Sequence, residues 1–399
     1  MNTVASVAGW SLLAVATLIV MVELGSRLWL RLIAHAYPWK PFTHFDITPN
    51  PKVLPQLSPR TQFKANSLGL RGTEAPVADR VFRIVTCGGS AVECFSLDES
   101  EAWPTLVEQH LSTAEAKAQI GVNAVHVLNL AKSGFTNEAL GYLLPRVLDR
   151  VGAIDVLTIT TGTSAVNAWT KAGTPPFAQS PGRPWDDVHW HGESTWGFTP
   201  STCAAAEIVR RLQHWRTRPV VAMRNTGSAL AAGRCARANA SEMRTATPDP
   251  HAWIADYEAS LGALIQSASR YARSIVLLRQ SWFDAPNPTP EVMSQFWHGF
   301  VGDAPPGERK IFYSYETFCK LMAATDAANI RVARRYGLET VHLAEAVTPS
   351  LENYYDQIHY TPAGAKRVAK FVAATLLKQV SSETVEAQLH PLPDRRPAA

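Results

Sequence analysis

The sequence is poor in charged residues and in cysteine. Only 18% of its 399 residues are charged, and the net charge of +4 is spread along the chain without a block of one sign. A nucleic-acid-binding surface needs a concentrated basic face, so no nucleic-acid partner is expected. The five cysteines contain no C-x-x-C pair, which argues against zinc and thioredoxin-like sites. Two alternatives stay open for the cysteines: a Cys203–Cys235 disulfide, or buried free thiols.

One long apolar run lies at the N-terminus. Val4 to Leu24 is apolar except for Glu23, and this length matches the roughly 20 residues that a helix needs to cross a bilayer. No Lys or Arg precedes Arg27, so the basic start of a secretory signal peptide is missing, although Ala34-His35-Ala36 resembles a cleavage site. The pattern favours an uncleaved transmembrane anchor over residues 1–36, with a signal peptide as the alternative.

The rest of the chain divides into three parts by composition, and the second of them contains an insertion. Residues 37–62 are rich in proline and are expected to form an extended linker. The folded domain is expected over 63–380, with an insertion rich in Pro, Gly, Ser and Trp at 165–250. Residues 381–399 end in a proline- and arginine-containing stretch and are expected to be a disordered tail.

Inside the domain, short β-rich runs alternate with helical stretches. The predicted strands are Phe82–Cys87, Ala124–Leu130, Asp155–Thr161, Ser274–Arg279 and Glu339–Leu343. The predicted helices are Trp103–Leu111, Asn137–Val147, Trp253–Tyr271, Tyr315–Tyr336 and a last helix that begins at Thr361-Pro362. Strands separated by helices predict an α/β fold, a three-layer sandwich around a parallel sheet. Functional residues are therefore expected just after the carboxyl ends of the strands.

Three short segments at such positions carry candidate chemistry. The first strand ends in Gly88-Gly89-Ser90, where the glycines permit a tight turn that exposes the serine hydroxyl. Asp356 precedes His359 by three residues just before the last helix, so its carboxylate can bond one ring nitrogen and leave the other for a hydroxyl. Gly134 follows the second strand, where a backbone N–H can face a developing oxyanion. Each segment alone is also compatible with an ordinary turn or helix cap.

The order of these segments resembles the SGNH (GDSL-type) hydrolases, in particular bacterial members with an N-terminal membrane helix. The blocks are Asn66-Ser67-Leu68-Gly69-Leu70-Arg71-Gly72, Gly88-Gly89-Ser90, Asn129 to Gly134, the strand ending at Gly162, and Asp356-Gln357-Ile358-His359. The resemblance covers roughly 66–376 and implies a flavodoxin-like parallel sheet of about five strands. No GxSxG motif occurs, which argues against the α/β-hydrolase alternative.

The resemblance also implies roles for residues. Ser90 would be the nucleophile and would donate its own N–H to the oxyanion, with Gly134 as a second donor. His359 would be the general base, oriented by Asp356. The third block departs from the family, because Ser164 stands where the family has an asparagine whose amide is a third donor, and Asn167 lies three residues further on. Ser164 and Asn167 are therefore alternative donors, and loss of such a donor typically lowers the rate about 10²- to 10³-fold.

The insertion contains further polar and aromatic residues that have more than one interpretation. His189-Trp190-His191-Gly192-Glu193 could be a metal site, but no third ligand from another element is identifiable. Trp185, Trp190 and Trp196 are compatible with an aromatic rim over the site or with tryptophans that pack a loop. Gln280, Ser281 and Trp282 follow the fourth strand and are expected near the pocket. No metal or cofactor is implied.

The resulting hypothesis is a membrane-anchored serine esterase or O-acyltransferase that uses an acyl-Ser90 intermediate. Its substrate would be a small acyl ester, such as an O-acetyl group on a glycan or lipid. The alternative is a catalytically weak or inactive binding or assembly protein that keeps the fold. Arg27, Arg31 and Lys40 favour a cytoplasmic domain by the positive-inside rule, whereas anchored enzymes of this type more often face the periplasm, so the orientation stays open.

Overall fold

The computed structural model describes residues 2–33, 37–173 and 203–389. Its central element is a sheet of five parallel strands in the order β10-β8-β5-β3-β4. The strands are β3 (Val81–Gly88), β4 (Ala124–Ala131), β5 (Ile154–Thr160), β8 (Ala272–Arg279) and β10 (Glu339–His342). All five predicted strands are present within two residues at each end, so the predicted α/β fold with about five parallel strands is confirmed.

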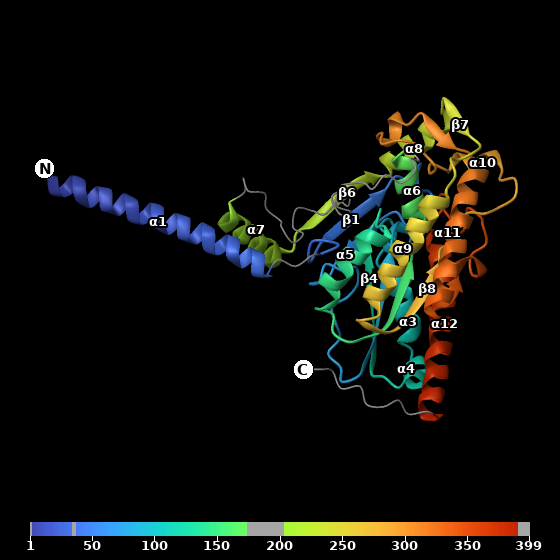
Figure 1. Ribbon diagram of the computed structural model, residues 1–399, viewed down its shortest axis with the longest axis horizontal. Coiled ribbons are helices and arrows are strands. Elements are labelled where there is room, and N and C mark those ends of the chain that lie inside the picture. Colours follow the sequence, from blue (N-terminus) through green and yellow to red (C-terminus); the bar gives the residue numbers. More distant parts are fainter. Residues whose placement is uncertain (1, 34–36, 174–202, 390–399) are drawn as a thin grey trace.

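Helices cover both faces of this sheet, because alternate strand residues point to opposite sides (Figure 1). On one face, Phe82 and Ile84 of β3 belong to a core shared with α3 (Trp103–Leu111) and α12 (Pro362–Leu389). On the other face, Val85 and Cys87 pack in a core with three further helices. These are α5 (Asn137–Leu148), α9 (His251–Ala268) and α11 (Tyr315–Tyr336). The arrangement is the three-layer sandwich that the resemblance to SGNH hydrolases predicts.

The segment predicted to be an extended linker is instead folded onto the domain. It contains β1 (His44–Pro49), which pairs antiparallel with β2 (Thr61–Lys64) and parallel with β6 (Val220–Thr226) in a second sheet. Trp39, Ile47 and Phe63 form a buried cluster beside this sheet. The prediction was wrong because the apolar residues between the prolines find burial partners far away in the sequence, and Pro49 is tolerated at the end of its strand.

The described part of the predicted insertion packs on two different elements. α7 (Ala204–Thr217) lies beside α1 (Asn2–Ile33), while β6 joins the second sheet and is followed by α8 (Ser228–Ala238) and β7 (Glu242–Arg244). Cys203 and Cys235 are both free, so the disulfide alternative is not realised. The histidines and tryptophans at 185–196 lie outside the described residues.

α1 projects away from the α/β domain (Figure 1). Residues Gly9–Leu30 are long and apolar enough to cross a membrane by length and composition, a test that a signal sequence also passes. Glu23 accepts hydrogen bonds from the backbone N–H groups of Ala204 (2.9 Å) and Ala205 (3.2 Å), so the first acidic side chain of α1 caps α7. At the other end of the chain, α12 continues to Leu389, beyond the predicted start of a disordered tail at 381.

Candidate active site

Ser90 begins the short helix α2 (Ser90–Glu93) directly after β3. The two positions before it require glycine, because neighbouring atoms lie too close for a Cβ. A Cβ on Gly88 would lie 2.4 Å from Val92 Cγ2 and 2.7 Å from the Thr160 carbonyl oxygen. A Cβ on Gly89 would lie 2.5 Å from Ser164 Oγ, and Gly89 has a negative φ of −90°. The sequence therefore selects glycine here for space at the junction of β3, β5 and the loop after β5.

The three residues predicted to form a triad lie within hydrogen-bond distance of one another. His359 Nε2 lies 2.7 Å from Ser90 Oγ, and His359 Nδ1 lies 2.7 Å from Asp356 Oδ2. An ionised carboxylate can only accept, so Nδ1 of His359 carries the donated proton and Nε2 of the neutral ring accepts from the Ser90 hydroxyl. This is the arrangement in which a serine can lose its proton to a base.

Asp356 is fully buried and is held as a carboxylate by donors on both oxygens. Oδ1 accepts from the backbone N–H groups of Ile358 and His359, at 2.9 Å each. Oδ2 accepts from the Trp297 indole N–H at 2.9 Å as well as from His359. Burial alone would raise the pKa of Asp356, but the charge and hydrogen bond of His359 and the backbone donors hold that pKa well below its ordinary value.

The loop that carries the dyad is fastened to the segment after β8. The Ser281 hydroxyl bonds the hydroxyls of Tyr354 (2.8 Å) and Tyr360 (2.7 Å), which flank the loop. The Phe283 N–H donates to the Gln357 carbonyl at 2.6 Å. The Tyr355 ring stacks on the His359 imidazole, with 5.4 Å between centroids and 8° between planes. These contacts fix the position of the imidazole opposite Ser90.

Arg71, in the block 66–72, holds the chain that follows Ser90 and does not line the pocket beside it. Arg71 is 1% exposed, and its guanidinium donates to the Glu93 carbonyl (2.7 Å) and the Leu97 carbonyl (2.9 Å). Its Nε also pairs with Glu99 at 3.0 Å. A planar guanidinium with five donors can hold several carbonyls at once. Arg71 thus fixes the chain that leaves α2.

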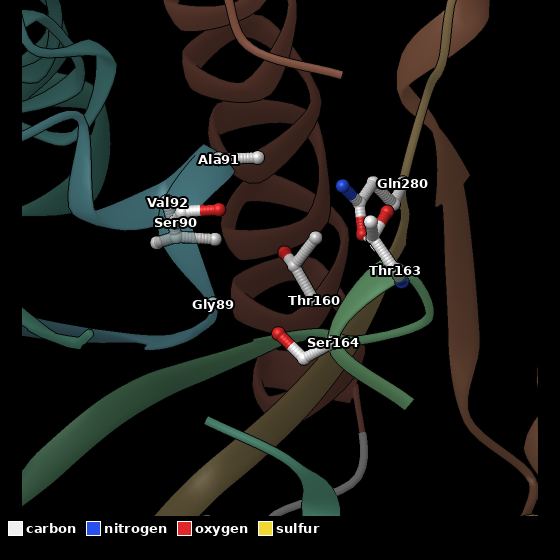
Figure 2. A pocket seen from close by; sticks show the side chains of 8 residues that line it. All are labelled: Gly89, Ser90, Ala91, Val92, Thr160, Thr163, Ser164 and Gln280. Atoms are coloured by element: carbon white, nitrogen blue, oxygen red, sulfur yellow. Dashed lines mark hydrogen bonds between the residues drawn. The ribbon is translucent and has the colours of Figure 1, made fainter. Parts of the chain in front are cut away.

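The structure places the predicted oxyanion donors in different surroundings, and of Ser164, Asn167 and Gly134 only Ser164 lines the pocket beside Ser90. Ser164, at the start of α6 (Thr163–Lys171), lines a small pocket together with Gly89 and Ser90 (Figure 2). The Asn167 amide instead bonds His298 Nδ1 at 3.1 Å, and Asn167 is not among the residues that line this pocket. Gly134 is likewise absent from the lining, although the carbonyl of the next residue would lie 3.8 Å from a Cβ on Gly89.

Four further residues belong to the site, and only one of them, Gln280, was expected near the pocket from the sequence. Trp297 and His298 stand 59 and 61 positions before their partners Asp356 and His359, in an irregular stretch after α10 (Pro290–Ser294). Thr160, the last residue of β5, and Gln280, just after β8, both line the pocket beside Ser90. Of the four, only Gln280 could be expected there, from its place after a parallel strand.

Three potential metal ligands meet at the base. His298, Asp356 and His359 offer atoms that lie within 4.8 Å of one another. Both ring nitrogens of His359 are already engaged, one by Asp356 and one by Ser90. Burial lowers the pKa of His298 to about 3, so this ring is neutral near pH 7. The set is therefore best described as a hydrogen-bonded Asp356–His359 pair beside a neutral second histidine.

Comparison with known proteins gives only distant likenesses. No protein-family model matches the chain, and no curated protein matches it. Among solved structures, it is similar to the acetylxylan esterase Axe2 from Geobacillus stearothermophilus, with 11% identity over 76% of this chain and 94% of that chain and a TM-score of 0.38. A lipolytic protein of the G-D-S-L family from Veillonella parvula shows 8% identity over 73% and 97%, and TesA shows 15% over 75% and 99%, both with a TM-score of 0.38.

Proposed function

We propose that this protein is a serine ester hydrolase or acyl-transfer enzyme of SGNH type. The observation that carries the proposal is the continuous hydrogen-bonded series Asp356–His359–Ser90, with 2.7 Å at each link. A buried carboxylate, a singly protonated imidazole and a serine at a strand end are together the parts that acyl transfer requires. The catalytic roles of the three residues belong to this proposal.

The reaction proceeds in two halves. Ser90 Oγ forms a bond to the acyl carbon while its proton passes to His359 Nε2, and the carbonyl electron pair moves onto the oxygen. The tetrahedral intermediate collapses by breaking the bond to the leaving alcohol, which takes the proton from His359. Water, or a second alcohol, then attacks acyl-Ser90 with His359 as base and releases the acid or the new ester. Asp356 stays ionised and stabilises the imidazolium in each half.

The pocket favours a short acyl group. The cavity bounded by Gly89, Ser90, Thr160 and Ser164 has a volume of about 10 Å³. That is roughly the space that one water molecule needs. The confined space beside Ser90 leaves little room for a long acyl chain, so we propose acetyl or similarly short esters as substrates. The apolar α1 would tether the enzyme to a membrane.

The proposal is tested with the detergent-solubilised full chain. Wild-type protein should be labelled by a fluorophosphonate and should cleave p-nitrophenyl acetate faster than p-nitrophenyl octanoate. Ser90→Ala should abolish both signals and His359→Ala should lower both at least about 10³-fold. Exposed Ser269→Ala and His251→Ala are the matched controls and should behave as wild type. A wild type that neither labels nor hydrolyses would favour a binding or assembly protein instead.

A further inference from the structure

We infer that Gln280 donates its side-chain amide N–H to the oxyanion, in the role that the third-block asparagine fills in SGNH hydrolases. This inference rests on the proposed function. It answers the question raised by Ser164, which stands at the asparagine's sequence position but has a shorter side chain and no amide. The donor would thus come from the end of β8 and not from the end of the neighbouring strand β5.

Gln280 lies in the pocket of the nucleophile. It follows β8 directly, is 7% exposed, and lines the same small cavity as Ser90 and Ser164. Figure 2 shows its amide nitrogen directed across this cavity toward the side of Ser90. The carbonyl oxygen of an ester whose acyl carbon contacts Ser90 would therefore enter a space that the Gln280 amide faces.

The orientation of the amide follows from its partner. The Thr163 backbone N–H lies 3.3 Å from Gln280 Oε1 and can only donate, so the oxygen of the amide must face the start of α6. The NH₂ group of Gln280 is thereby turned away from α6 and toward the cavity. One hydrogen bond fixes which end of this side chain is offered to a substrate.

The backbone around Gln280 is anchored to the catalytic loop. The next residue, Ser281, is fully buried and bonds Tyr354 and Tyr360 through its hydroxyl. Arg279, the preceding residue, pairs with Asp326 of α11. A donor held by its own flanking residues needs no reorganisation when charge develops on the substrate, which is the condition for effective oxyanion stabilisation.

A second polar group on the same wall lacks a protein partner. Thr160 is 3% exposed and lines the cavity, and its hydroxyl has no hydrogen bond within the described part of the chain. Buried hydroxyl groups are usually hydrogen-bonded, because an unpaired one has lost its bonds to water without replacement. A substrate oxygen between Thr160 and Gln280 would satisfy it. The polar lining of this cavity thus fits an oxygen that carries negative charge.

The test compares two substitutions of Gln280. Together they distinguish hydrogen-bond donation to the substrate from a purely structural role of this side chain. Gln280→Met removes both the donor and the acceptor at similar length. Gln280→Glu keeps an oxygen that accepts from Thr163 N–H but places a second acceptor, and negative charge, where the NH₂ group was. With p-nitrophenyl acetate, both variants should show kcat lowered about 10²- to 10³-fold with KM changed less than threefold. Exposed Gln213→Met on α7 is the matched control.

The outcomes are distinct. If Gln280 served only to support the fold, Gln280→Glu would be close to wild type while Gln280→Met would be impaired in thermal unfolding, and that result overturns the inference. Ser90-dependent hydrolysis that is equally fast in both Gln280 variants also overturns it and leaves the proposed function intact. Absence of any Ser90-dependent hydrolysis in the wild type removes the proposed function and the Gln280 role together.

Discussion

The two sides of Ser90 differ in how completely their polar groups are satisfied. On the base side, both oxygens of Asp356 and both ring nitrogens of His359 have partners within the protein. On the other side, Thr160 presents a buried hydroxyl for which the described residues provide no partner. Buried polar groups are nearly always hydrogen-bonded, so the unpaired Thr160 hydroxyl marks a place for a ligand atom beside Ser90. His298 Nε2, on the side of His359, also lacks a partner among the described residues. Under the proposed function, Asp356 and His359 are in place before substrate binds, and the opposite wall is completed by the substrate.

The largest effect on kcat is expected from a substitution of Asp356, whose two carboxylate oxygens both accept hydrogen bonds. Asp356→Asn keeps the size of the side chain but favours the wrong tautomer of His359, because an amide can donate to Nδ1. We expect kcat to fall about 10⁴-fold, as such a substitution does in a serine protease triad. Hydrolysis of p-nitrophenyl acetate measures it, and exposed Asp249→Asn is the control. A loss of less than tenfold would show that Asp356 does not orient the base.

His298 lies beside His359, and its Nε2 has no partner among the described residues. Its lowered pKa predicts how the stability of the protein depends on pH. Burial lowers its pKa from 6.5 to about 3 in the folded protein, whereas the unfolded chain titrates near 6.5. Between these values the unfolded state binds the extra proton, so this group's contribution to stability is complete above about pH 6.5 and is lost as pH falls. His298→Gln should remove about 1.4 kcal/mol per pH unit from the slope of unfolding free energy in that range.

Urea unfolding at several pH values between 3.5 and 7 measures this slope. His251→Gln is the control, because the side chain of His251 is 92% exposed and should leave the slope unchanged. If His298→Gln and wild type have parallel curves, the pKa of His298 is the same in the folded and unfolded states, and burial does not lower it.

The third prediction concerns the crowded junction under Ser90. Gly89→Ala places a methyl group 2.5 Å from Ser164 Oγ and should destabilise the fold by about 1–3 kcal/mol. Ser164→Ala removes that oxygen, after which the nearest atoms to the new methyl group would be 3.8 Å away. The double variant should therefore recover most of the loss in urea unfolding. Additive effects of the two substitutions would show that these residues are not in contact.

The smallest effect is expected far from the site, at the contact of α1 with α7. Glu23→Gln weakens the charged cap on the Ala204 and Ala205 N–H groups without removing its oxygen. Hydrogen exchange of these two amides should become several-fold faster while kcat stays at the wild-type value. The opposite result, protected amides with altered kcat, would connect the anchor to the chemistry of Ser90.

Local sequence patterns were sufficient for the catalytic edge of the sheet. Four of the five strands are rich in apolar residues and stand between helices, while β10 is mostly polar. Ser90 follows a strand end, and Asp356 and His359 lie in a short turn before α12. Asp356 and His359 are near neighbours in sequence, whereas Ser90 and His359 are 269 positions apart. The rule that parallel strands place their carboxyl ends at one edge predicted where Ser90 lies. The expected roles came from the order of the blocks, which resembles the SGNH hydrolases.

The parts that could not be predicted depend on contacts across long sequence separations. Trp297 reaches Asp356 from another segment, and Asn167 is drawn to His298 and away from the pocket. The proline-rich segment at 37–62 becomes a strand because β6 pairs with it. Gly89 and Ser164 stand in separate blocks of the sequence, yet a Cβ on Gly89 would lie 2.5 Å from Ser164 Oγ. Pairings of this kind are decided by the assembled core and have no local signature.

Because β1 pairs with β6, two fragments of the chain that carry these strands could associate with each other. A cut between Gly173 and Cys203 would place Ser90 on one fragment and Asp356 and His359 on the other. The fragments would still share the β1–β6 ladder, the β5–β8 ladder and the contact of α1 with α7. The protein is therefore suited to production as two separate halves, and the Ser90-dependent hydrolysis that we propose would report their reassembly.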